Sequence, residues 1–387
     1  MTLNIVVDEN IAGALDSLSE LGTVRLVNGR NLCAGELRNA NVLLVRSVTP
    51  VNEALLAGTA VSFVGTATSG FDHVDRAYLE RAGISFAHAP GSNANAVVEY
   101  VLSVIAAVDD KLEQLFAGGT VGIIGYGNIG RRLADRLNAL QISHKVYDPW
   151  LDEGQVPNSA ALADILQCDV ISVHAQLTRN TPWPSFHLLG SFELAEIADN
   201  TLLINASRGS VVDTIALQKQ LAAGRGPIAV LDVWEDEPVV NEPLLSQLRF
   251  GTAHIAGYSL DGKLLATQML KEALLRHLKM PLTGQVNIAE RAEGPDLFLA
   301  GGLGRAALLR KLLHQHYDPA TDDRLLRSAV TGHSKKNAAA SFDRLRKEYR
   351  NRRELRGSLI RTSTHDATTL RIIDAVGAQR VTDSRQP

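Results

Sequence analysis

The sequence predicts an α/β fold with two doubly wound parallel sheets, followed by a small α+β region. Between residues 3 and 279, short apolar segments alternate with helical patterns, an order typical of parallel sheets covered by helices. Several segments, such as NVLLV and VGIIG, are continuously apolar, as expected for strands buried on both faces. From residue 285 onward, proline and charged residues become more frequent, which indicates a third region. A chain of 387 residues is also too long for one ordinary core.

The first sheet is expected within residues 1–90. Segments rich in valine, isoleucine and phenylalanine are predicted as its strands: NIVVD, TVRLV, NVLLVR, VSFVGTA and ISFAHA. Helical patterns separate these strands, including IAGALDSLSEL and HVDRAYLERAG. The second pattern ends at Gly83, a residue type that commonly caps helix C-termini.

Pro90-Gly91-Ser92-Asn93 separates this part from a second strand-helix series. A long apolar helix is predicted over residues 94–112. The strands predicted after it are TVGIIG, HKVYD, VISVH, TLLINAS, IAVLDV and FGTAHIA. A further helix over residues 261–279, closed by Pro281, could return the chain to the first domain.

The region from residue 285 to the C-terminus predicts a small α+β domain, because SLIRTSTHDATTLRIIDAVGAQRV has strand-helix-strand texture. Residues 342–356, FDRLRKEYRNRRELR, are predicted as an arginine-rich helix. A charge run of this kind is ordinarily a solvated helix face. A subunit contact and an anion-binding site are the alternatives.

The composition is that of a globular protein, with 45% hydrophobic and 21% charged residues. A net charge of -3 gives no global field that would attract nucleic acid or an anionic membrane. The N-terminus lacks signal-peptide features, and the most apolar helix, interrupted by Glu99, is too short to span a bilayer. Cys33 and Cys168 fit a reducing compartment and show no metal-ligand spacing. We therefore expect a cytoplasmic protein with no metal, membrane or nucleic-acid partner.

The strongest local motif is Gly125-x-Gly127-x-x-Gly130, between an apolar strand and an amphipathic helix. The first glycine makes a tight turn, the second admits a pyrophosphate to the backbone, and the third lets helix and strand pack closely. The helix N-terminus offers N–H groups and a positive dipole to phosphates. Asp148 ends the next strand, where a carboxylate binds ribose hydroxyls and repels a 2′-phosphate. The motif therefore predicts NAD rather than NADP.

Four further residues that can carry chemistry lie at or beyond predicted strand ends: Arg208, Asp232, Glu237 and His254. Ligands of open parallel sheets bind at the carboxyl ends of the strands. An arginine can hold a carboxylate and polarise an adjacent oxygen. A histidine can take a hydroxyl proton near neutral pH, and a carboxylate can orient its ring. Together they predict redox chemistry at C2 of a hydroxy acid, although each alone could be an ion pair, a loop charge or a core histidine.

These motifs resemble the D-isomer-specific 2-hydroxyacid dehydrogenases. The resemblance is carried by the glycine motif, Asp148, Ser207-Arg208-Gly209, Asp232, Glu237-Pro238 and His254-Ile255-Ala256-Gly257. Further stretches resemble, more narrowly, the members that act on 4-phospho-D-erythronate. These stretches are VDEN, LVRSVTPVNEALL, FVGTATSGFDHVD, APGSNANAVVEYV, LDVWEDEP and HIAGYSLDGK. The stretch FDRLRKEYRNRREL is similar to the C-terminal dimerisation domain of those members. The likeness spans nearly the whole chain.

The resemblance implies a domain organisation and a partner. A flavodoxin-like substrate domain would comprise residues 1–91 and 258–282, and a Rossmann NAD domain residues 92–257. Residues 285–387 would form the dimerisation domain, so a homodimer is expected. Closure of the cleft between the first two domains would exclude water before hydride transfer.

The resemblance also implies roles for individual residues. The catalytic residues would be Arg208, Glu237 and His254. NAD would be bound by Gly125, Tyr126, Gly127, Asn128, Ile129, Gly130, Asp148, Asp232 and Gly257. The substrate would be bound by Arg46, Ser47, Thr68 and Tyr258. Ala175 stands where the family usually has a threonine, and loss of one neutral hydrogen bond costs about 0.5–1.5 kcal/mol.

The expected reaction is NAD-dependent oxidation of 4-phospho-D-erythronate to (R)-3-hydroxy-2-oxo-4-phosphooxybutanoate, in pyridoxal 5′-phosphate biosynthesis. One alternative is a related dehydrogenase of the 3-phosphoglycerate or glyoxylate type. That alternative gives no reason for the tail or for Arg46-Ser47. The other is an NAD-sensing binding protein without turnover, which an intact catalytic trio does not exclude. The segment TPWPSFH at residues 181–187 has no explanation from the sequence.

Overall fold

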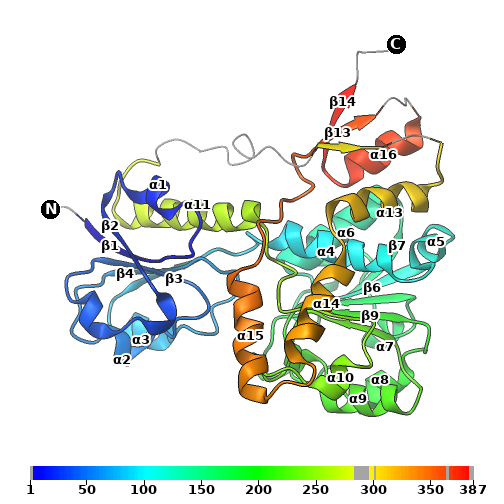
Figure 1. Cartoon of the computed structure of the whole chain (residues 1–387), viewed down its shortest axis with the longest axis horizontal. Helices are drawn as coiled ribbons and strands as arrows, with labels where there is room; N and C mark the ends of the chain where they lie inside the picture. The colour runs from blue at the N-terminus through cyan, green and yellow to red at the C-terminus, as the bar shows by residue number, and fades with distance from the viewer. Residues whose placement is uncertain (1–2, 283–295, 300–301, 363–365, 383–387) are drawn as a thin grey trace. The chain divides into compact units, whose positions relative to one another are not determined.

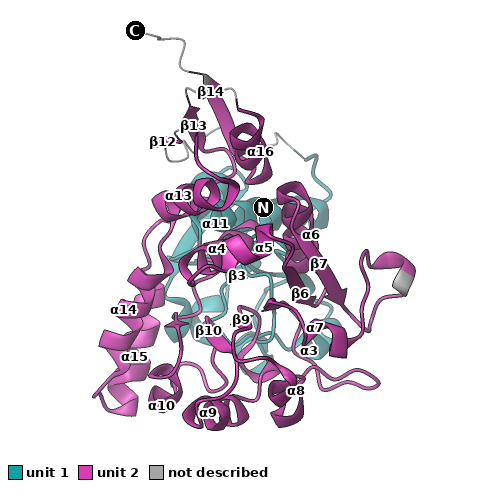
Figure 2. Ribbon diagram, turned by 90° about the vertical axis from the view of Figure 1, so that its right-hand side faces the viewer, with its two compact units in different colours: residues 1–93, 259–292 teal, residues 94–258, 293–387 magenta. Residues whose placement is uncertain are grey.

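A computed structural model describes residues 3–282, 296–299, 302–362 and 366–382. The chain forms two compact units, drawn in different colours in Figure 2. Unit 1 comprises Met1–Asn93 and Ser259–Ala292, and unit 2 comprises Ala94–Tyr258 and Glu293–Pro387. The expected division into three domains stays a prediction.

Unit 1 is built on a five-stranded parallel sheet with the order β2-β1-β3-β4-β5. Its strands are β1 (Leu3–Asp8), β2 (Gly22–Val27), β3 (Val42–Val45), β4 (Phe63–Thr66) and β5 (Ser85–His88). All residues of β3 and β4 are buried, as their continuous apolar sequence predicts. This strand order is the flavodoxin-like one, so the predicted doubly wound fold is confirmed for this sheet.

The helices of unit 1 are α1 (Ala14–Leu18), α2 (Glu53–Leu56), α3 (Arg76–Arg81) and α11 (Leu260–His277). Helix α11, although late in the chain, packs against β4 and β5 (Figure 1). Its Leu270 and Leu274, one helical turn apart, are fully buried in a cluster with Phe63. The late helix thus belongs to the first sheet.

Unit 2 contains a six-stranded parallel sheet with the order β11-β10-β9-β8-β6-β7. Its strands are β6 (Thr120–Ile124), β7 (Ser143–Tyr147), β8 (Val170–Val173), β9 (Leu202–Asn205), β10 (Ile228–Leu231) and β11 (Phe250–Gly251). The order reverses at β6, which has β7 on one side and β8 on the other. Such a reversal opens a crevice at the carboxyl ends of the strands, where ligands bind in sheets of this kind.

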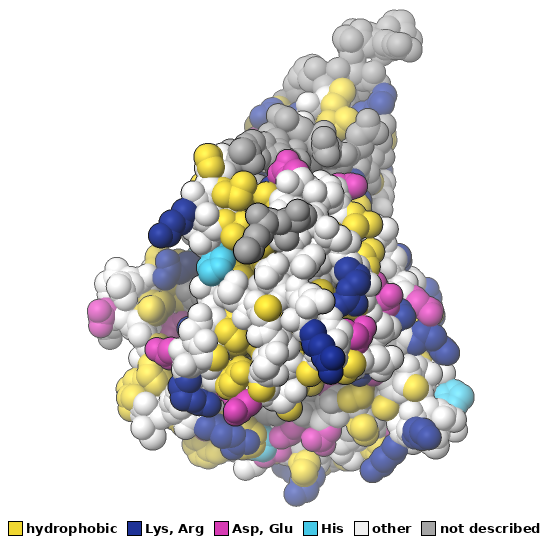
Figure 3. Space-filling model, turned by 90° about the vertical axis from the view of Figure 1, so that its left-hand side faces the viewer, with side chains coloured by type: hydrophobic (Ala, Val, Ile, Leu, Met, Phe, Trp, Pro, Cys, Tyr) yellow, Lys and Arg dark blue, Asp and Glu magenta, His cyan; other side chains and the backbone are white. Residues whose placement is uncertain are grey.

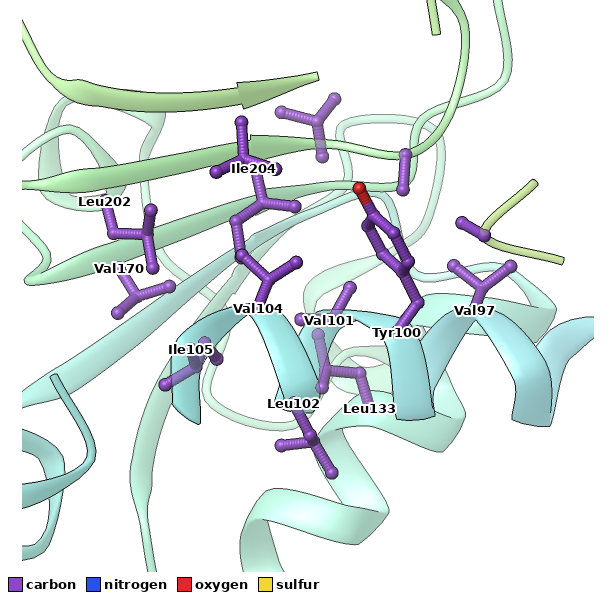
Figure 4. Close-up of a cluster of buried hydrophobic side chains, with 14 of the residues drawn as sticks. Val97, Tyr100, Val101, Leu102, Val104, Ile105, Leu133, Val170, Leu202 and Ile204 are labelled. Carbon is purple, nitrogen blue, oxygen red and sulfur yellow. The ribbon is translucent and has the colours of Figure 1, made fainter. Parts of the chain in front are cut away.

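The core of unit 2 is organised around α4 (Ala94–Ala107), most of whose side chains are buried. Figure 4 shows residues of this helix beside Leu133 of α6 (Asn128–Leu140) and residues of β8 and β9: Val97, Tyr100, Val101, Leu102, Val104, Ile105, Leu133, Val170, Leu202 and Ile204. The predicted helix over residues 94–112 was too long. It is interrupted at Asp109, whose φ is +43°, and a second helix, α5 (Lys111–Phe116), follows.

The remaining helices of this part are α6 (Asn128–Leu140), α7 (Leu162–Ile165), α8 (Ser191–Glu196), α9 (Thr214–Ala222) and α10 (Glu242–Leu245). Helix α6 buries Gly130, Leu133, Ala134, Leu137 and Leu140. Their three- and four-residue spacing places them on one face, which packs on the sheet.

The C-terminal part of unit 2 combines helices with a three-stranded parallel sheet, β12-β13-β14 (Figure 1). Its elements are β12 (Asp296–Phe298), α13 (Arg305–His316), α14 (Pro319–Val330), α15 (Lys335–Lys347), β13 (Leu359–Thr362), α16 (Ala367–Ala375) and β14 (Gln379–Thr382). The predicted strand-helix-strand texture is confirmed by β13, α16 and β14. Helix α13 packs against α4 and α5, and α14 packs against β11.

The arginine-rich run differs from its prediction in two respects. Its helix ends at Lys347 rather than near residue 356. A solvated face is also the wrong description for Arg352, which is 5% exposed and donates hydrogen bonds to the carbonyl oxygens of Ala96 and Ala256. The run therefore attaches the C-terminal part to α4 and to the loop after β11.

The molecular surface mixes charges of both signs, as the composition predicts. On the face in Figure 3, Lys and Arg side chains are interspersed with Asp and Glu. Within the described residues, no helix combines the length and apolarity needed to cross a membrane.

Candidate active site

The glycine motif forms the turn between β6 and α6, and each glycine occupies a different environment. Gly125 has a φ of +96°, and a β-carbon there would lie 2.7 Å from the backbone nitrogen of Ala175. A β-carbon at Gly130 would overlap the carbonyl oxygen of Gly125. At Gly127 a β-carbon would meet nothing within 4 Å. Gly125 and Gly130 are therefore required for close backbone packing in the turn, whereas Gly127 borders open space.

The residues around this turn fit a dinucleotide. No side chain caps the N-terminus of α6, so the amides of its first turn, at Asn128 and Ile129, are open to a ligand. At the end of β7, the Asp148 carboxylate accepts hydrogen bonds from the backbone N–H groups of Tyr126 (2.8 Å) and Trp150 (3.1 Å). These contacts fix the carboxylate beside the glycine turn.

The segment at residues 181–187, unexplained by its sequence, folds back over the loop that follows β8. The Ser185 hydroxyl donates to the carbonyl oxygen of Gln176 (2.6 Å) and accepts from the N–H of Thr178 (2.8 Å). The Trp150 indole donates to the carbonyl oxygen of Trp183 (3.1 Å). The segment thus braces both the loop after Asp148 and the loop that contains Ala175.

His254 and Glu237 form a hydrogen-bonded pair. The distance from His254 Nδ1 to Glu237 Oε2 is 2.7 Å, and Glu237 Oε1 accepts from the N–H of Trp234 (2.9 Å). Burial alone would raise the pKa of Glu237. The charge of His254 and its hydrogen bond outweigh that effect and lower the pKa. The bond engages Nδ1, so Nε2 is the ring nitrogen left for the predicted proton transfer.

The backbone at His254 is not the strand that FGTAHIA predicts, because β11 ends at Gly251. His254 adopts a φ of +55°. This backbone conformation is stabilised by three hydrogen bonds, all accepted by Asp232. Its carbonyl oxygen accepts from the N–H of His254 (2.7 Å), and its carboxylate accepts from the N–H groups of Ile255 (2.8 Å) and Ala256 (3.0 Å). Burial raises the pKa of Asp232 although these donors oppose the rise. The contact of Asp232 with NAD stays a prediction.

Arg208 lies in the turn after β9, against the loop that carries Glu237. A β-carbon at Gly209 would overlap the backbone of Trp234, so the two loops are in direct contact. Asn205 donates to the carbonyl oxygen of Arg208 (3.0 Å), and Arg208 Nη1 donates to the carbonyl oxygen of Ser207 (2.9 Å). The structure therefore brings the arginine turn to the loop of the histidine-glutamate pair.

Gly257 and Tyr258 complete the loop that begins at His254. The N–H of Tyr258 donates to the carbonyl oxygen of Ile255 (2.8 Å), which forms a turn through Gly257. The Tyr258 ring packs edge-on against Tyr349 of the C-terminal part, with ring centres 5.8 Å apart. Tyr258 thus joins the proposed site to a region that the motifs did not include.

In unit 1, the other predicted substrate residues follow β3 and β4. Arg46 is half-buried, and its Nε donates to Asp8 at the end of β1 (3.2 Å). Ser47 is exposed, and the Thr68 hydroxyl donates to the carbonyl oxygen of Gly70 (2.6 Å). Asp8 was missed from the sequence, although it ends the predicted strand NIVVD, at the edge where ligands of parallel sheets bind.

Two glycine variants are expected to separate folding from NAD binding. Gly130→Ala should lower the free energy of unfolding by about 1–3 kcal/mol, because its methyl group overlaps backbone. Gly127→Ala should change stability by less than about 0.5 kcal/mol, since its methyl group enters open space. It should nevertheless weaken NAD binding, because backbone and pyrophosphate can no longer approach. Thermal melts and NAD titration by calorimetry measure both, and parental NAD affinity in Gly127→Ala would contradict the assignment of the turn.

Comparison with known proteins agrees with this architecture. Residues 105–256 match the D-isomer specific 2-hydroxyacid dehydrogenase NAD-binding domain, and residues 290–377 match a domain of unknown function. The erythronate-4-phosphate dehydrogenases of Cellvibrio japonicus and Serratia proteamaculans are 43% and 42% identical to this chain. Those matches cover 93% and 97% of this chain, and 95% and 99% of the relatives.

Solved structures share the fold at lower identity. An NAD+-bound 3-phosphoglycerate dehydrogenase of Entamoeba histolytica has a TM-score of 0.62 at 21% identity and covers 74% of this chain and 99% of its own. A D-lactate dehydrogenase of Aquifex aeolicus, complexed with NAD and lactic acid, has a TM-score of 0.58 at 23% identity. It covers 71% of this chain and 95% of its own.

Proposed function

Because the chain belongs to the erythronate-4-phosphate dehydrogenases, we propose that it oxidises 4-phospho-D-erythronate at C2 with NAD. The product is (R)-3-hydroxy-2-oxo-4-phosphooxybutanoate, an intermediate of pyridoxal 5′-phosphate biosynthesis. The observation that carries the chemistry is the 2.7 Å hydrogen bond between His254 and Glu237, on a loop in contact with the Arg208 turn. A hydroxy-acid oxidation needs a base, a group that orients it and a cation for the carboxylate.

The three residues divide the work. Arg208 holds the C1 carboxylate and polarises the C2 oxygen, a task suited to a planar guanidinium. His254 takes the C2 hydroxyl proton at Nε2. Glu237 accepts a hydrogen bond from Nδ1 of His254 and stabilises the protonated ring. Bound NAD supplies the hydride acceptor. The lowered pKa of Glu237 keeps this carboxylate ionised well into the acid range, so His254 retains its partner.

The cofactor is held by the glycine turn and the end of β7. The backbone from Gly125 to Gly130, including Tyr126, Asn128 and Ile129, takes the pyrophosphate. Asp148 takes the ribose hydroxyls and disfavours NADP. Asp232 and Gly257 lie on the loops that carry the reacting residues and contact the nicotinamide end. The empty space at Gly127 supports this arrangement.

Substrate contacts are proposed for Tyr258 and, in unit 1, for Arg46, Ser47 and Thr68. Arg46 contributes a guanidinium, and the other three contribute hydroxyl groups, which suit an anionic, polyhydroxylated acid. The position of these residues after parallel strands or on the His254 loop supports the proposal.

A homodimer formed through the C-terminal part is also proposed. Its three-stranded sheet leaves Phe298 53% and Leu359 36% exposed, and a second copy of the chain could cover them. A cytoplasmic location is proposed because Cys33 and Cys168 are both free thiols.

The assay that tests the function uses purified protein, NAD, a 2-oxo acid acceptor and 4-phospho-D-erythronate. The controls are 3-phosphoglycerate and unphosphorylated D-erythronate. Fast turnover of the phosphorylated four-carbon acid is expected, with D-erythronate oxidised only at a much higher KM and 3-phosphoglycerate not oxidised. Turnover of 3-phosphoglycerate instead would retain the chemistry and reject the substrate. NAD binding without turnover of any of them would favour an NAD-sensing protein.

A further inference from the structure

A second arginine of unit 2 lies beside the proposed site, and it comes from the C-terminal part. Arg346 is in the last turn of α15. Its guanidinium carbon lies 5.7 Å from the ring centre of Tyr258 and 5.9 Å from that of Phe342. The neighbouring basic residues Arg344 and Lys347 are exposed. The helix therefore turns one basic side chain inward, toward the loop that begins at His254.

The surroundings of Arg346 keep its guanidinium charged and leave one of its donors available to an anion. Its Nε is buried and has no hydrogen-bond partner within the described part of the chain. Burial opposes the charge of the guanidinium, but the phenol of Tyr258 and the Glu237 and Asp232 carboxylates raise its pKa above the ordinary value. The side chain therefore stays cationic. A buried donor left unpaired is costly, and an absent ligand is one explanation for it.

Within unit 2, the residues assigned so far leave one end of the substrate without a cation. Arg208 and Glu237 formally cancel, and Arg208 is committed to the carboxylate and the C2 oxygen. A phosphomonoester adds up to two further negative charges at neutral pH. In unit 1, Arg46 is already paired with Asp8, which balances its charge. Arg346 is half-buried and retains an unused N–H, and a guanidinium fork fits phosphate oxygens bidentately.

We propose that Arg346 binds the phosphate of 4-phospho-D-erythronate, so that the C-terminal part supplies a substrate-specificity residue to the active site. This inference rests on the proposed function and names the group that selects its substrate. Tyr258 lies against the guanidinium and can add its hydroxyl to the same phosphate. Loss of the C-terminal contact therefore costs recognition of the phosphorylated acid rather than the chemistry at C2.

The test compares Arg346→Gln with Arg344→Gln, a charge removal at an exposed position of the same helix. With 4-phospho-D-erythronate, Arg346→Gln should raise KM about 10- to 100-fold, the range for a lost charge-assisted hydrogen bond, and leave kcat within a few-fold. With D-erythronate its kinetics should match those of the parent. Arg344→Gln should match the parent with both substrates. Arg346→Lys should have a KM between those of the parent and Arg346→Gln, because the ammonium keeps the positive charge but cannot bind phosphate bidentately.

Equal losses with both substrates, or no loss with either, would overturn the proposal. A second readout is independent of turnover: inorganic phosphate should raise the Tm of the NAD-loaded parent and of Arg344→Gln, but not that of Arg346→Gln. If the parent fails to oxidise 4-phospho-D-erythronate, the proposed function fails, and the phosphate shift alone still decides the role of Arg346. If Arg346→Gln does not fold, Arg346→Lys is compared with the parent in the same two measurements. A parental KM and a parental phosphate-induced rise in Tm in Arg346→Lys would contradict bidentate binding of the phosphate by the guanidinium.

Discussion

Replacing His254 by asparagine should lower kcat with 4-phospho-D-erythronate by about 10²- to 10⁴-fold, the usual contribution of a positioned general base. Asparagine is the informative substitution because His254 has a φ of +55°, a conformation that asparagine adopts more readily than most residues. The loop should therefore keep its fold while it loses the imidazole. Initial-rate measurements of NADH formation at saturating substrate give the effect.

NAD affinity and Tm should stay close to the parental values in this variant. His333→Asn, at an exposed histidine far along the chain, is the matched control and should keep full activity. A kcat within ten-fold of the parent would show that another group takes the C2 hydroxyl proton.

Replacing Arg208 by alanine should lower kcat/KM by about 10²- to 10³-fold, because one guanidinium holds the carboxylate and stabilises the charge that develops on the C2 oxygen. The fold should tolerate the change. The turn is held by main-chain contacts, including the hydrogen bond from Asn205 to the carbonyl oxygen of residue 208, which alanine keeps. Steady-state kinetics with both phosphorylated and unphosphorylated erythronate measure the loss.

The loss should be similar with the two substrates, since both carry the carboxylate; this separates Arg208 from Arg346. Arg208→Lys should recover only part of the activity, because an ammonium cannot make the bidentate contact. Arg225→Ala removes an exposed arginine of the same sheet region and serves as the control. Activity of Arg208→Ala within a few-fold of the parent would remove the arginine from the mechanism.

The parts of the site that could be predicted from sequence are those that follow strands. The glycine motif, Asp148 and Arg208 each follow an apolar segment directly, and parallel topology brings strand ends to one edge. Local chemistry then assigns each a role. For the same reason both doubly wound sheets were predictable: continuous apolar strands and intervening helices are local features.

The remaining features depend on contacts between distant parts of the chain. Helix α15 reads as a solvated basic helix, yet Arg346 faces a tyrosine 88 positions earlier, which no periodicity can reveal. The residue type of His254 and its position after an apolar segment identified it in the sequence. Its left-handed backbone could not be predicted, because it depends on hydrogen bonds to Asp232, which follows a different strand. The interruption at Asp109, by contrast, is a local backbone feature that the long apolar pattern conceals.

The late arrival of the C-terminal part has a consequence for synthesis of the protein. Glu99, buried in the middle of α4, accepts hydrogen bonds from His316 (3.0 Å) and from the N–H of Leu355 (2.8 Å), which lie 217 and 256 residues further along the chain. At roughly 5–20 residues per second, a ribosome takes on the order of 10–50 s to supply them. During that interval the helix can fold only with an unpartnered carboxylate in its core. Emergence of the segment that carries His316 and Leu355, rather than emergence of the first sheets, should therefore be the step after which unit 2 resists proteolysis, and a translational pause before that segment should leave unit 2 open to chaperones.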